Sequence, residues 1–136
     1  MDTFQNQHNI FPKGEKTSAD YFTGTSWLNL LVAKDETEKY AIGNVEFEAG
    51  SRTNWHTHPA GQILLVTQGK GIYQEKDKAP RQLNKGDVVI IPSHIEHWHG
   101  ATNESSFTHI AVTNIIEKVN VEWLTPVSEE EYLACQ

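Results

Sequence analysis

The chain has 136 residues, of which 38% are hydrophobic and 21% are charged, so it can fold as one domain with a sizeable core. Its formal net charge is −7, so the chain has no excess of basic residues that would displace counterions from phosphates, and we expect no nucleic-acid partner. The single cysteine, Cys135, excludes an intrachain disulfide and is expected to be an inert residue of a frayed tail.

Neither end of the chain shows a targeting or membrane signal. The first ten residues contain no basic segment followed by an apolar run, so no signal peptide is predicted. No stretch approaches the roughly 20 apolar residues of a membrane span. We therefore expect a cytoplasmic protein without a membrane partner.

In chain order, residues 1–20 are polar and rich in turn residues, which predicts an N-terminal arm before a compact domain over residues 21–136. Runs rich in β-branched and aromatic residues then predict strands at 27–33, 41–48, 63–67, 71–75, 88–91 and 107–116. The charged segment 34–39 is predicted to be a turn, and residues 68–70 are predicted to connect a hairpin. This pattern indicates an all-β sandwich or barrel, of which the jelly roll is one form.

Only residues 128–134 are predicted to be helical, with Ser128 and Glu131 forming a capping box. Val45, Phe47 and Leu64 are expected in the barrel interior. Trp55 and Trp98 alternate out of phase with their histidine neighbours, so we expect them outside the barrel or at a dimer contact.

Histidines carry the strongest functional signal. Six of the seven lie between positions 56 and 109, and they include two His-x-His pairs, His56 with His58 and His97 with His99. Residues two apart on a strand face the same side, so two such pairs on facing strands can surround one point. Imidazoles in this arrangement suit Zn, Cu, Fe or Ni, and the pattern predicts a metal site.

The spacing of these residues resembles the first motif of the cupin superfamily, Gly-x5-His-x-His-x3,4-Glu-x6-Gly. Gly50, His56, His58, Gln62 and Gly69 match it in every spacing, with a glutamine at the usual glutamate position. The resemblance implies a double-stranded β-helix, or jelly-roll, barrel.

The second cupin motif, Gly-x5-Pro-x-Gly-x2-His-x3-Asn, is matched at Gly86, Pro92 and His97, whereas His94 and Ala101 depart from it. Through the two motifs, the resemblance implies one divalent metal ion on four ligands. These ligands are His56, His58, Gln62 and His97.

The segments GSRTNWHTHPAGQILLVTQGKG, HWHG and THIAV are similar to a narrower group of small bacterial cupins that includes manganese-dependent hydroxynitrile lyases. That likeness implies manganese as the metal, with iron, zinc or nickel as alternatives, and active-site roles for His99 and His109. One position departs from the group, because a polar amide of the lyase pocket falls on Thr113.

The residues themselves leave several roles open. His99 can be a proton acceptor or can orient His97, and His109 can exchange a proton near neutral pH. Thr53 could offer its hydroxyl to a bound oxygen, and His94 is expected at the rim. Gln62 adds no negative charge, so the site should attract anions more strongly than one with glutamate.

Three functions follow as hypotheses. The first is a lyase acting on a small hydroxylated or carbonyl substrate, such as a cyanohydrin. The second is an iron-dependent oxidoreductase or dioxygenase. The third is a non-enzymatic barrel that binds a small ligand, associated with carboxymuconolactone decarboxylase-like proteins. A homodimer or higher homo-oligomer is expected, with exchange of the N-terminal arm.

Overall fold

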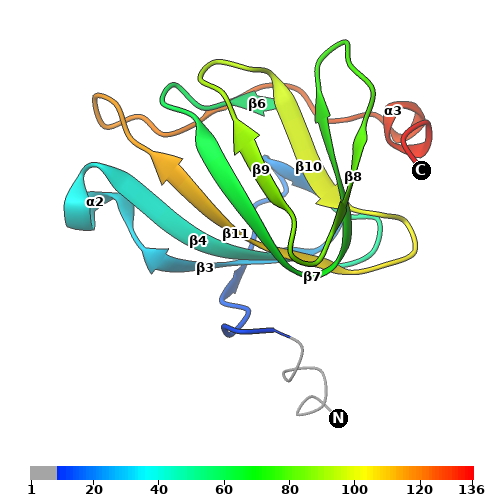
Figure 1. Ribbon diagram of the computed structural model, residues 1–136, viewed down its shortest axis with the longest axis horizontal. Helices are drawn as coiled ribbons and strands as arrows, with labels where there is room; N and C mark the ends of the chain where they lie inside the picture. The colour runs from blue at the N-terminus through cyan, green and yellow to red at the C-terminus, as the bar shows by residue number, and fades with distance from the viewer. Residues whose placement is uncertain (1–8) are drawn as a thin grey trace.

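The computed structural model describes residues 9–136 (Figure 1). Within this described range, twelve strands, all paired antiparallel, curl into a barrel with two facing sheets. One sheet contains β1 (Glu15–Lys16), β3 (Ser26–Val32), β4 (Tyr40–Phe47), β11 (Phe107–Asn114), β9 (Val88–Ile91) and the first half of β7 (Gln62–Glu75). The other contains the second half of β7 with β8 (Arg81–Asn84), β10 (His97–Ala101), β5 (Arg52–Thr53), β6 (His56–Thr57), β2 (Phe22–Thr23) and β12 (Glu122–Trp123). The predicted all-β, double-stranded β-helix barrel is confirmed.

The predicted hairpin at residues 68–70 is wrong, because β7 runs without interruption from Gln62 to Glu75. Gly69 has a positive φ of 77° and is the last residue of β7 that pairs with β11, whereas Lys70 already pairs with β8. A Cβ at this position would collide with the carbonyl oxygen of Ser106. Glycine therefore bends one strand so that it can pass from one sheet into the other.

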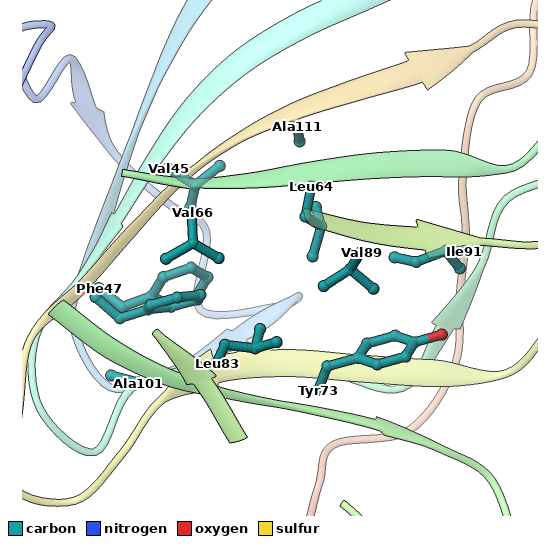
Figure 2. Packing of buried hydrophobic residues seen from close by; sticks show 11 residues of the cluster. Val45, Phe47, Leu64, Val66, Tyr73, Leu83, Val89, Ile91, Ala101 and Ala111 are labelled. Atoms are coloured by element: carbon teal, nitrogen blue, oxygen red, sulfur yellow. The ribbon is translucent and has the colours of Figure 1, made fainter. Parts of the chain in front are cut away.

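The core lies between the two sheets, where the side chains of several strands point toward one another (Figure 2). Phe47, Leu64 and Phe107 are fully buried there, and Val45 is 7% exposed, so the predicted interior positions are confirmed. Alternation along each strand places these side chains inward, where removal of apolar surface from water stabilises the barrel.

A second apolar cluster lies outside the barrel, beneath the C-terminal helix α3 (Glu129–Leu133). Ser128 caps this helix together with Glu131, as predicted. Trp98 is fully buried in the cluster, and Tyr132 donates a hydrogen bond to the carbonyl of Ala101 at 2.6 Å. The expectation of a frayed Cys135 is wrong, because its side chain is only 4% exposed.

The ends of the predicted elements differ from the structure in two further places. The charged segment 34–39 contains a one-turn helix, α2 (Lys34–Thr37), in place of a simple turn. Within the predicted arm, Glu15–Lys16 pairs with β3 of the same chain. The boundary at residue 20 stays a prediction, and His8 lies outside the described residues. No helix in the described part of the chain is long and apolar enough to cross a membrane.

Candidate metal centre

Three histidines of the barrel are held by the same kind of hydrogen bond. The Nδ1 atoms of His56, His58 and His97 lie 2.8, 2.7 and 2.8 Å from the backbone carbonyl oxygens of Asn54, Asn120 and Ile95, respectively. A carbonyl oxygen can only accept, so each Nδ1 must carry the proton. Each Nε2 is then unprotonated and has a free lone pair, and this is the ring tautomer that a metal ligand needs.

The free ring nitrogens of His58 and His97 are buried and have no hydrogen-bond partner among the described residues. Burial of polar atoms without partners is costly, and such atoms call for an explanation beyond packing. A cation would satisfy these lone pairs, so the residues present fit a bound divalent metal.

Gln62, at the start of β7, presents the same kind of unsatisfied atom. Its Nε2 donates a hydrogen bond to Oγ1 of Thr113 at 2.8 Å, and its Oε1 is buried without a partner. The Thr113 hydroxyl therefore fixes which end of the amide faces the site. In the sequence, Thr113 is notable only because it stands where a related lyase pocket has an amide side chain. In the structure, its hydroxyl orients Gln62.

The histidine rings converge closely. One ligand nitrogen from each of His56, His97 and His99 lies within 4.8 Å of the others, a three-histidine group that could hold a metal ion. The His58 ring centroid is 4.9 Å from that of His56 and 5.3 Å from that of His97. His99 therefore belongs to the cluster of converging rings. The four-ligand set of His56, His58, Gln62 and His97 stays a prediction.

His99 and His109 form a hydrogen-bonded pair beside this cluster. Nε2 of His109 lies 3.1 Å from Nδ1 of His99, and both side chains are buried. One hydrogen occupies this contact, so only one ring donates at a time. The outer nitrogens, Nε2 of His99 and Nδ1 of His109, have no partner in the described part of the chain. The pair can therefore take up a proton at one end and release one at the other.

Burial controls the charge of all five imidazoles. Desolvation lowers the pKa of His97 to about 4 and that of His109 to about 3. It also lowers the pKa values of His56, His58 and His99, and for His56 and His99 the neighbouring imidazoles lower them further. The rings are consequently neutral at pH 7, as both metal coordination and proton acceptance require.

A cavity of about 210 Å³ is lined by four of these histidines, namely His56, His58, His99 and His109. Its walls are mainly apolar, and no lysine, arginine, aspartate or glutamate lines it in the described chain. The lining outside the histidines includes Phe22, Leu28, Val45, Ala111, Val121 and Trp123. Such a pocket suits a small, uncharged and largely apolar ligand.

Some contributors were not foreseen from the sequence. Trp123 lies with its ring centroid 4.8 Å from that of His56 and stacks on Tyr21 at 4.8 Å. Asn120 contributes only a backbone carbonyl, a role that no pattern of side chains in the sequence predicts. Thr53 accepts a hydrogen bond from the backbone N–H of His99 at 3.3 Å and also lines the cavity. The expected rim residue His94 is exposed.

The barrel and its inward-facing histidines together define a small, single-domain β-barrel of the kind that encloses a metal. The chain belongs to the cupin family, whose cupin-domain model matches residues 43–113. A protein named (R)-mandelonitrile lyase from Granulicella tundricola is 39% identical over 117 residues, covering 86% of this chain and 89% of that protein.

Solved structures agree with this assignment. A cupin-like protein from Thermotoga maritima is 46% identical, with a TM-score of 0.90 over 93% of this chain and 96% of that one. A DMSP lyase from Ruegeria pomeroyi is 22% identical, with a TM-score of 0.65 over 89% of this chain and 62% of that one. The second likeness shows the fold alone.

Proposed function

We propose that this protein is a metal-dependent lyase that cleaves and forms small, apolar cyanohydrins. The observation that carries the proposal is the set of buried histidine nitrogens, together with the Gln62 oxygen, that have no hydrogen-bond partner in the described chain and lie at or next to an uncharged pocket. A relative named (R)-mandelonitrile lyase, matching 86% of this chain, supports the reaction class.

In this proposal His56, His58, His97 and Gln62 hold the metal, and manganese is the ion we expect. Once bound, the ion would supply Lewis acidity with about two positive charges, since three neutral imidazoles and an amide cancel none of its charge. The Nδ1–H contacts to backbone carbonyls keep the rings oriented, and Thr113 keeps the Gln62 oxygen directed inward.

The histidine pair supplies the base. His99 takes the substrate hydroxyl proton at Nε2 and passes its Nδ1 proton across the 3.1 Å contact to Nε2 of His109. The bond between the carbinol carbon and the nitrile carbon breaks, so its electron pair leaves with cyanide and an aldehyde remains. Burial keeps both imidazoles neutral at pH 7, so a ring nitrogen is free to receive the proton, and the lowered pKa values mean that the pair holds this proton only weakly.

The pocket walls favour this substrate class. Leu28, Val45 and Ala111 present aliphatic surface, and Trp123 and Phe22 present aromatic surface. An ammonium substrate would find no carboxylate in the cavity lining of the described chain, whereas a neutral aryl or alkyl cyanohydrin loses little on desolvation.

Mandelonitrile cleavage by manganese-loaded protein, followed as benzaldehyde release, tests the proposal. We expect cleavage above the metal-free control and a loss of at least about 100-fold in kcat for His109→Ala at unchanged metal content. His94→Asn changes an exposed histidine and is the matched control. No cleavage by metal-loaded wild-type protein would refute the proposed reaction, and full activity of His109→Ala would refute its role as the proton acceptor behind His99.

A further inference from the structure

A groove of about 580 Å³ lies on the surface beside the histidine cavity. We call it the outer groove, and its walls are residues 14–18, Tyr21, Phe22, residues 28–30 and Trp123. Four of these residues also line the cavity, namely Phe22, Leu28, Leu30 and Trp123. The groove and the cavity therefore adjoin at four apolar side chains.

The boundary between the two spaces is open at Leu30. This side chain borders both of them and is 58% exposed, so it does not seal one from the other. Leu28, two residues earlier on β3, is half-buried and packs against the core. Gly43 of β4 leaves room for both, because a Cβ there would lie 2.9 Å from Leu28 and 3.9 Å from Leu30. An aliphatic surface thus runs from the cavity out to the groove.

Aromatic rings supply the rest of this boundary. The Trp123 ring stacks on that of Tyr21, with centroids 4.8 Å apart and planes at 16°, and lies 4.8 Å from the His56 ring. Phe22 lies 5.7 Å from Trp123 at an angle of 55°. Tyr21 is 41% exposed, so part of this aromatic surface is open to a ligand. Such surfaces bind flat rings by offset or edge-to-face stacking.

The cavity alone is small. Pockets that enclose drug-sized ligands have volumes of about 300–1,000 Å³, whereas this cavity has about 210 Å³. It suits one ring with its reactive substituent, and a longer substrate must place its remainder outside. The outer groove adjoins the cavity and has more than twice its volume.

We infer that the outer groove is a second subsite, which binds the far ring of a neutral, two-ring aryl substrate whose reactive carbon lies in the cavity. The substrate class rests on the proposed function, which places the reactive carbon there. The boundary side chains carry no charge, so a neutral ring loses little on desolvation between them. Glu15 and Lys16 in the groove wall have opposite charges, and together they favour neither an anionic nor a cationic tail.

Isothermal titration calorimetry of the manganese-equilibrated full chain tests the second subsite with two probes, benzaldehyde and biphenyl-4-carbaldehyde. The probes share one reactive group and differ by one ring. We expect wild-type protein to bind the two-ring aldehyde at least about tenfold more tightly, because the second ring buries apolar surface in the groove.

Two groove variants should lose this preference. Tyr21→Ala removes the ring that stacks on Trp123, and Leu30→Asn replaces an exposed apolar side chain at the boundary. Each should reduce the preference to about threefold or less, with benzaldehyde affinity unchanged within about twofold.

Two further variants serve as controls. Tyr40→Ala is matched to Tyr21→Ala, because Tyr40 is 40% exposed and lines neither space, and it should keep the full preference. Ala111→Val changes the cavity wall outside the groove and should weaken the binding of both aldehydes alike. Circular dichroism verifies that each variant is folded.

Equal affinity of wild-type protein for the two aldehydes would overturn the second subsite, and so would a full preference in both folded groove variants. Assays of cyanohydrin cleavage separate this result from the proposed reaction. A two-ring preference without cleavage of either cyanohydrin would refute the lyase and support the subsite. Cleavage of mandelonitrile without a two-ring preference would support the lyase and refute the subsite.

Discussion

Acid should destabilise the metal-free protein through its buried imidazoles. His97 has a folded pKa of about 4 and His109 one of about 3, against 6.5 for an exposed imidazole. Below pH 6.5 the unfolded chain binds protons that the folded chain does not, so stability falls with pH until each folded pKa is reached. Between pH 7 and pH 5, linkage gives about 2 kcal/mol of lost stability from each residue, or about 4 kcal/mol together.

Urea denaturation in the presence of a chelator at pH 7 and pH 5 measures this loss directly. Because a domain of this kind has a free energy of unfolding of about 5–15 kcal/mol, the change is large enough to resolve. His109→Leu should remove the share of the loss that comes from its own ring, about 2 kcal/mol between pH 7 and pH 5, whatever its effect on absolute stability. A loss below about 1 kcal/mol in wild-type protein would refute the reasoning that burial keeps these rings neutral.

Three further changes probe the site and the barrel. Gln62→Glu should weaken azide binding to metal-loaded protein by about tenfold or more, because a carboxylate near the ion opposes a second anion; equal or tighter azide affinity by titration would contradict this. Thr113→Val should lower metal affinity by about 10–100-fold, because it removes the hydroxyl that orients Gln62. Competition with a chelating dye measures this affinity, and an unchanged value would show that the hydroxyl does not affect metal binding. Gly69→Ala should destabilise the fold by at least about 1–3 kcal/mol, since its φ is +77° and the carbonyl of Ser106 blocks a Cβ; an unchanged Tm would contradict that packing.

The strands were largely predictable because one face of most of them is buried. Alternating residues predicted 41–48 and 107–116, and the structure has Tyr40–Phe47 and Phe107–Asn114. The failure at Gly69 has a specific cause. A glycine between two apolar runs signals either a turn or an irregular position within a strand, and here β7 continues through Gly69, against which the backbone of Ser106 packs.

The site was predictable to the extent that its residues are local in sequence. The His-x-His pairs announced a cluster, and the structure brings His56, His97 and His99 together. The contacts that orient the rings could not be predicted from the sequence. The carbonyl of Asn120, for example, lies 62 positions from His58 along the chain, and any residue type can supply a backbone carbonyl. The hydrogen bond from Gln62 to Thr113 likewise depends on the pairing of β7 with β11.

Metal content of the purified protein and two variants tests the central claim, that His56, His58, His97 and Gln62 hold one divalent cation. After equilibration with manganese and removal of free ion, elemental analysis should find one ion per wild-type chain, almost none in His58→Ala and an undiminished amount in His99→Ala. A wild-type protein that stays empty with manganese, iron, zinc and nickel would contradict the claim, and so would an ion that is lost from His99→Ala yet retained by His58→Ala.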